Sequence, residues 1–131
     1  AIWLDTGSEP IAGSTRLKAG TAQKITLNAL SSLLMILLDK VYEGLMVDLR
    51  VLNEKLVRRS EEMLVQLTAC SRREARDALH RSGGSVKVAT LLLYGCEIEE
   101  ALKLLDRAKG QLRGALDLID TGAGTGKNRA R

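Results

Sequence analysis

The second half of the chain repeats itself at a distance of 26 residues, and this repeat restricts the folds that the chain can adopt. The matched pairs are Glu74/Glu100, Ala75/Ala101, Leu79/Leu105, Arg81/Arg107, Gly84/Gly110, Ala89/Ala115 and Leu92/Leu118. Each copy reads as a helix, a glycine turn and a shorter helix. One such hairpin cannot bury its apolar face alone, whereas two can cover each other. We therefore expect a compact four-helix unit over residues 71–121.

Start and stop signals set the expected helix boundaries in this half. Ser71 and Glu74 form a capping box, which marks a helix start. Glycines at 83–84, 95 and 110 are helix stops. Together with the apolar periodicity, these signals predict helices over about 53–67, 71–82, 85–94, 97–109 and 111–119.

The first half predicts one strand and one long helix. Residues 1–5 form a short apolar run before a turn, which is typical of a strand. A single strand cannot form a sheet, so its partners would have to come from elsewhere. Ser14 or Thr15 is expected to cap a helix from Arg16 to Leu38. Gly44 is expected to be the breaker after that helix.

Two features of the first half leave alternatives open. Residues 45–52, LMVDLRVL, fit either an extended or a helical segment. Residues 19–22 place small side chains on the first turns of the long helix, where either another backbone or a ligand can approach closely.

Composition argues against a nucleic-acid partner. The chain has no Phe, one Trp and two Tyr, so it offers few aromatic platforms for stacked bases. Lys127, Arg129 and Arg131 account for most of the net charge of +4, so the charge belongs to a tail and not to a basic groove. We expect residues 122–131 to be a disordered tail. Its glycines imitate a phosphate loop, but Thr121 and Asn128 break that pattern.

Membrane, metal and cofactor sites are not expected either. The apolar run 25–38 is too short and too polar to cross a bilayer. Cys70 and Cys96 lack the spacing of metal ligands and read as free thiols of a reducing compartment. His80 is expected at the surface of a helix. These features favour a cytoplasmic protein.

Residues 7–24, GSEPIAGSTRLKAGTAQK, form a glycine-rich turn that runs into the long helix. The first amides of a helix lack intrahelical partners and carry partial positive charge, so they can hold an anion. Ser14 and Thr15 add hydroxyl donors, Arg16 can form a forked pair, and Lys18 adds a point charge. These four residues are the candidate phosphate-binding residues. The alternative is an ordinary capped helix with two exposed cations.

The same stretch closely resembles the signature of the family of N-acetylmuramic acid 6-phosphate etherases and glucokinase regulatory proteins, which have sugar-isomerase (SIS) domains. The family pattern is approximately G-P/A-E-x-I/V-x-G-S-T/S-R-M/L-K-A/G-G-T/S-A-x-K. Ser8 stands where Pro or Ala is usual, and Pro10 replaces a commonly aliphatic residue. These departures affect the entry to the turn and not its GSTR core.

The resemblance continues along the chain. Residues 27–60 are similar to the etherase pattern of a long helix followed by K-V-Y-x-x-L-M-V-D and N-E-K-L-x-x-R. The spacing at 101–116 looks like the last two helices of a ubiquitin-associated-like (UBA-like) bundle, with generic hairpin packing as the alternative. The implied fold is mainly α: residues 1–70 as the C-terminal remnant of an α/β SIS domain, with one strand and long helices, and residues 71–121 as a UBA-like domain of two helical hairpins.

The family resemblance implies a lyase of cell-wall (peptidoglycan) sugar recycling. Its etherase members cleave the D-lactyl ether of N-acetylmuramic acid 6-phosphate, giving N-acetylglucosamine 6-phosphate and D-lactate. The implied mechanism is elimination then hydration, with two glutamates as acid and base and no metal or other cofactor. In the family these glutamates lie upstream of the signature, so no catalytic residue is assigned in this chain.

The expected contribution of this chain is therefore binding of a phosphorylated amino sugar and formation of a homodimer, without activity alone. Glu9 and Gly13 belong to the signature and are possible pocket residues, whereas the roles of Asn53 and Lys55 stay open. Two other interpretations remain: a non-catalytic module that senses sugar phosphates, and a helical dimerisation domain.

Overall fold

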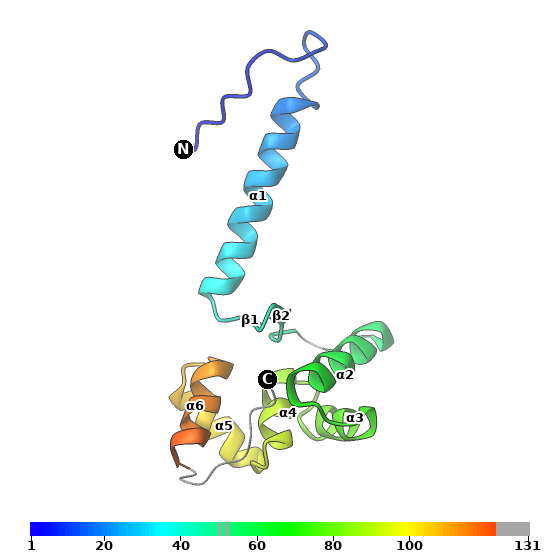
Figure 1. Cartoon of the computed structure of the whole chain (residues 1–131), viewed down its shortest axis with the longest axis vertical. Coiled ribbons are helices and arrows are strands. Elements are labelled where there is room, and N and C mark those ends of the chain that lie inside the picture. Colours follow the sequence, from blue (N-terminus) through cyan, green and yellow to red (C-terminus); the bar gives the residue numbers. More distant parts are fainter. Residues whose placement is uncertain (50, 52, 123–131) are drawn as a thin grey trace. The chain divides into compact units, whose positions relative to one another are not determined.

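The structure is a computed structural model of the chain, and it describes residues 1–49, 51 and 53–122 (Figure 1). The elements are α1 (Lys18–Leu37), β1 (Val41–Tyr42), β2 (Leu45–Met46), α2 (Glu54–Thr68), α3 (Arg72–Arg81), α4 (Val86–Leu93), α5 (Ile98–Arg107) and α6 (Leu112–Gly122). The expectation of a mainly α protein is confirmed. The expected tail lies, from residue 123 onward, outside the described residues. The chain forms two compact units, residues 1–38 and residues 39 onward.

The strand expected over residues 1–5 is wrong. The structure gives these residues no regular element, and Trp3 is 88% exposed. The physical reason is that a strand exists only when a neighbouring strand accepts its hydrogen bonds, and no described segment lies alongside to do so.

Helix α1 starts two residues later than expected, at Lys18. Its N-cap is Leu17, and neither Ser14 nor Thr15 caps it through a side chain, so that expectation is also wrong. The helix ends at Leu37, where the amide of Leu38 donates to the Leu34 carbonyl. No residue of α1 is buried within the described part of the chain. Among the described residues, no helix combines the length and the apolar character needed to cross a membrane.

Gly44, which was expected to end the long helix, lies instead in the turn of a short β-hairpin. Strands β1 and β2 pair antiparallel, with Val41 opposite Met46 and Tyr42 opposite Leu45. Glu43 and Gly44 both have positive φ, 48° and 76°. Positive φ at both central residues characterises the two-residue turns that match the twist of a hairpin. Residues 45–52 fitted either an extended or a helical segment; Leu45 and Met46, which pair with β1, are extended.

The hairpin is fixed to the start of α6 by polar contacts within the second unit. The side-chain Nε2 of Gln111 donates to Asp39 Oδ2 at 2.8 Å, and Arg113 pairs with Glu43 at 3.0 Å. The guanidinium carbon of Arg113 also lies 5.0 Å from the ring centroid of Tyr42. These contacts join segments about 70 residues apart in the sequence.

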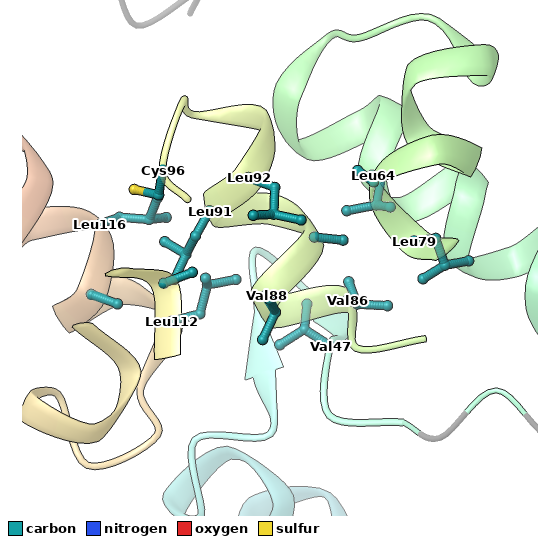
Figure 2. Packing of buried hydrophobic residues seen from close by; sticks show 14 of the residues in the cluster. Val47, Leu64, Leu79, Val86, Val88, Leu91, Leu92, Cys96, Leu112 and Leu116 are labelled. Carbon is teal, nitrogen blue, oxygen red and sulfur yellow. The ribbon is translucent and has the colours of Figure 1, made fainter. Parts of the chain in front are cut away.

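Helix α4 is the centre of the second unit. Six of its eight residues are buried, because it contacts α2 and α3 as well as α5. Figure 2 shows Leu91 of α4 near Leu112 of α6, and Val47, from the segment after β2, near Val86. The core is aliphatic, as the composition indicates.

The sequence repeat has a structural counterpart in the turns. Gly84 and Gly110 have φ of 85° and 79°. Their amides donate to the carbonyls of Leu79 and Leu105, at 2.9 and 2.7 Å, which closes each helix with a Schellman-type bond. The capping box at Ser71 and Glu74 is confirmed as well.

The contacts of α2 bear on the division of the chain at residue 70. Helix α2 packs on α3 and α4, so in this structure it belongs to the same compact unit as the helical hairpins. The two hairpins meet chiefly through α4 and α5, which follow each other in the chain. The assignment of two separate domains stays a prediction.

Candidate functional site

The turn before α1 and the first residue of that helix, Lys18, hold all six predicted site residues. Gly13 has φ of 77°, a left-handed conformation that favours glycine. The turn closes on itself through backbone bonds, in which the amide of Ser14 donates to the Ile11 carbonyl and the amide of Leu17 to the Ser14 carbonyl. Thr15 and Arg16 are exposed, and Ser14 is half-buried.

The expected anion cradle at the start of α1 is occupied by a carboxylate of the chain itself. Glu9 Oε2 accepts from the amide of Lys18 and Oε1 from the amide of Ala19, both at 3.0 Å. These two hydrogen bonds, the Ala19 bond first, lower the pKa of Glu9 below its ordinary value of 4.5. Glu9 is thus an ionised cap of α1 at neutral pH.

Lys18 binds the chain segment that leads to Glu9. Its ammonium donates to the carbonyls of Ser8 at 2.7 Å and Thr6 at 3.2 Å. The amide of Gly7 donates to Asp5 Oδ1 at 2.9 Å. The charge of Lys18 is therefore directed toward backbone carbonyls in this structure, whereas the sequence predicts a phosphate as its partner.

Gly20 explains the small side chains at the start of α1. Its amide donates to the Thr15 carbonyl at 2.8 Å, and a Cβ at position 20 would lie 3.3 Å from that oxygen. The close approach that small residues permit is made by the backbone of the turn itself.

The groups that remain open to a ligand are side chains. In the described part of the chain, the hydroxyls of Ser14 and Thr15 and the guanidinium of Arg16 make no hydrogen bond or ion pair. A hydroxyl pair and a forked cation suit a phosphate ester. An open apolar depression lies beside the turn and is lined by Thr6, Leu17, Lys18, Thr21, Ala22 and Ile25.

Sequence reasoning missed the capping role of Glu9. Local capping signals place the acidic residue within the first turn or at the N-cap, whereas Glu9 precedes the first helical residue by nine positions. The family signature includes Glu9, but nothing in its spacing indicates the two amide contacts.

Two residues of open role belong to the second unit. Asn53 is the N-cap of α2, and its side chain accepts from the amide of Leu56 at 3.0 Å. Lys55 lies exposed in the first turn of that helix. Among the described residues, no three His, Cys, Asp or Glu side chains are grouped so that they could hold a metal ion.

Curated relatives share the sequence over most of this chain, although no family model matches it. An N-acetylmuramic acid 6-phosphate etherase of Oceanobacillus iheyensis is 48% identical over 114 residues, which cover 86% of this chain and 39% of the relative. The etherase of Halalkalibacterium halodurans is 47% identical over 116 residues, covering 88% and 39%. That of Deinococcus radiodurans is 49% identical over 116 residues, covering 88% and 38%.

The chain therefore spans about two fifths of the length of the curated relatives that it matches. Identity of this level over such a length shows common descent for the matched region, and the recognised signature lies in the C-terminal portion of the relatives. The chain is a homologue of the C-terminal portion of the N-acetylmuramic acid 6-phosphate etherases.

Proposed function

We propose that this chain supplies part of the phosphosugar site of an enzyme that cleaves the D-lactyl ether of N-acetylmuramic acid 6-phosphate. The observation that carries the proposal is the preformed turn at Gly13–Arg16, found in a chain similar to etherases. The products would be N-acetylglucosamine 6-phosphate and D-lactate. The acid and base would come from residues outside this chain.

The turn has the chemistry of a phosphate site. Arg16 can donate two parallel hydrogen bonds to phosphate oxygens, while the hydroxyls of Ser14 and Thr15 supply single donors. Because the turn is closed by its own backbone bonds, the backbone that carries these side chains would not have to be ordered when the ligand binds, which favours affinity.

The apolar surface of α1 supports its assignment as a helix of a SIS domain. Eight apolar side chains of α1 and its C-cap are between 46% and 68% exposed: Ile25, Leu27, Leu30, Leu33, Leu34, Ile36, Leu37 and Leu38. Such a surface is rarely left uncovered. In the proposed enzyme it packs against a sheet that this chain does not itself contribute, and residues 71–121 form the UBA-like region.

The same surface favours a homodimer as the second candidate role of the chain. If α1 pairs with a copy of itself, the 131-residue chain will be a dimer in light scattering at micromolar concentration. A strict monomer at high concentration would contradict this part of the proposal. A cytoplasmic location, which the sequence features favour, stays a prediction.

A chimera tests the proposed activity. The residues that precede the matched region in the Oceanobacillus iheyensis relative are fused to this chain, and D-lactate is measured with N-acetylmuramic acid 6-phosphate as substrate. We expect lactate from the chimera and none from this chain alone. Turnover by this chain alone would show that the acid and base are within it.

Variants of the chimera test the phosphate site. Arg16→Gln should raise KM at least about 10-fold, since a hydrogen bond to a charged group contributes roughly 1.5–3 kcal/mol. Arg107→Gln is the matched control, because Arg107 is an exposed cation on α5. Equal KM values for the two variants would remove Arg16 from the site.

A further inference from the structure

The backbone amides at the start of α1 could bind an anion, and the Glu9 carboxylate of the same chain occupies them. Helix N-termini commonly bind phosphate through their first amides. Here the amides of Lys18 and Ala19 already donate to the two oxygens of Glu9, each at 3.0 Å. A phosphate could reach these amides only by displacing the carboxylate.

Lys18, whose amide donates to Glu9, also binds the segment that precedes Glu9. The backbone amide of Lys18 donates to Glu9, and its ammonium donates to the carbonyls of Thr6 and Ser8. Residues 6–9 are therefore attached to Lys18 at three points. This attachment fixes the N-terminal end of the loop that carries Gly13 to Arg16.

The other end of the loop is fixed by backbone bonds to α1. The amide of Gly20 donates to the Thr15 carbonyl at 2.8 Å, and the amide of Leu17 donates to the Ser14 carbonyl at 3.1 Å. With Glu9 in place, the backbone amides of residues 14, 15 and 17–20 all donate to acceptors within residues 9–15. The side chains of Ser14, Thr15 and Arg16 are left to bind a ligand.

We propose that Glu9 is a positioning residue that fills the N-terminus of α1, so that a phosphosugar binds to the side chains of Ser14, Thr15 and Arg16 and not to the amides of Lys18 and Ala19. The identity of the ligand rests on the proposed function. Glu9 itself does not touch the ligand. Its role is to hold the turn in shape and to exclude a second anion from the helix amides.

Amide NMR of the 131-residue chain tests the arrangement without a ligand. Glu9 has a lowered pKa, so the amide shifts of Lys18 and Ala19 should change together as the pH falls below about 4.5. Of the charged side chains nearby, Lys18 is the one that acts on Glu9, and the Asp5 carboxylate lies in the same segment, where it accepts from the amide of Gly7. Asp5→Asn is the control variant, because it removes the other carboxyl group of this segment and leaves Glu9 in place. In Glu9→Gln the Lys18 and Ala19 titration should disappear, and its persistence would overturn the proposal.

Titration with N-acetylglucosamine 6-phosphate at neutral pH tests the division between side chains and amides. In the unchanged chain, ligand-induced shifts should be large at Ser14, Thr15 and Arg16 and small at Lys18 and Ala19. In Glu9→Ala the vacated amides of Lys18 and Ala19 should respond to the ligand as well, and they should respond to inorganic phosphate. The control Asp5→Asn should behave as the unchanged chain.

The outcomes separate this proposal from the proposed function. Large shifts at Lys18 and Ala19 in the unchanged chain would overturn the positioning role even if the sugar phosphate binds. If the sugar phosphate causes no shift in any variant, this chain alone does not bind it; the KM values of the chimera variants then decide the proposed function, and the pH titration alone decides the role of Glu9. Glu9→Gln keeps the size of the side chain, so it remains informative if Glu9→Ala unfolds the turn.

Discussion

The buried carboxylate of Glu61 on α2 forms a two-point ion pair with the exposed guanidinium of Arg76 on α3. The distances are 2.7 Å between Nε and Oε1 and 3.3 Å between Nη2 and Oε2. The Glu61 side chain is 0% exposed and that of Arg76 is 70% exposed. The hydrogen bonds from Arg76 lower the pKa of Glu61. The pair therefore joins two helices and supplies the buried carboxylate with a charged partner.

Glu61→Gln should lower the stability of the second unit and remove part of its acid sensitivity. The pKa of Glu61 is lower in the folded chain than its ordinary value of 4.5. Its contribution to stability is thus complete above that value and is lost as the pH falls through the folded pKa. Urea unfolding at pH 7 and pH 3 measures this: the variant should lose more stability at pH 7 than at pH 3.

Glu62→Gln is the matched control for this measurement. Glu62 is the next residue of α2, and it pairs with Arg72 at 3.4 Å with a side chain that is 63% exposed. Exposed ion pairs contribute little to stability. An equal loss in both variants at pH 7 would show that burial of Glu61 does not decide its contribution.

Leu91→Ala should be among the most destabilising changes in the chain. Leu91 is 0% exposed and lies in α4, the helix that contacts α2 and α3 as well as α5. Removing a buried leucine side chain costs about 2–5 kcal/mol, depending on how far the cavity collapses. Thermal unfolding followed by circular dichroism measures the loss. Leu102→Ala is the control, since Leu102 lies on α5 and is 53% exposed; the prediction fails if both variants unfold at the same temperature.

The helices of the second unit could be predicted because their signals are local. Capping by Ser71 and the glycine stops at 84 and 110 act within a few residues, so the boundaries follow from the sequence. The hairpin at Val41–Met46 was missed because Glu43 adopts a positive φ without being glycine. The strand over residues 1–5 was wrong because a strand depends on a partner and not on its own composition.

The sequence predicted which residues form the turn before α1, but it did not predict the hydrogen bonds of Glu9 and Lys18. The hydroxyls, the guanidinium and the glycines at 13 and 20 are readable from the signature. The capture of the helix amides by Glu9 spans about ten residues, and no local pattern encodes a contact of that reach. The engagement of Lys18 with Ser8 is of the same kind.

Asn53→Ala should destabilise α2 by about 1 kcal/mol, because the alanine cannot accept from an amide at the helix start. Asn53 has the extended backbone of an N-cap and accepts from the amide of Leu56 at 3.0 Å. Asn53→Asp keeps an acceptor oxygen and should retain the stability of the unchanged chain. Urea unfolding compares the three. If Asn53→Asp loses as much as Asn53→Ala, the side chain contributes something other than a cap.

Alanine at Gly110 or Gly84 should destabilise the chain by about 1–2 kcal/mol, since both positions have left-handed backbone. A Cβ at position 110 would meet nothing within 4 Å, whereas one at position 84 would lie 3.4 Å from Val51 Cβ. The loss at Gly84 should therefore equal or exceed that at Gly110. Gly110→Asn is the control, because asparagine tolerates this conformation better. The prediction is contradicted if asparagine and alanine cost the same.

Gly20→Ala should change the turn before α1 more than it changes the helix. Alanine favours a helix over glycine by about 1 kcal/mol, but its Cβ would lie 3.3 Å from the Thr15 carbonyl oxygen. That oxygen must move, and the bond from the residue 20 amide, now 2.8 Å, lengthens with it. We expect unchanged helical content, shifted amide signals at Ser14 and Thr15, and weaker binding of N-acetylglucosamine 6-phosphate by calorimetry.

Gly114→Ala is the matched control for Gly20→Ala, because its Cβ would also meet a neighbour at 3.3 Å, the Ala108 Cβ, yet Gly114 belongs to the other compact unit. Unchanged binding in Gly20→Ala would mean that the position of Thr15 does not matter to the site.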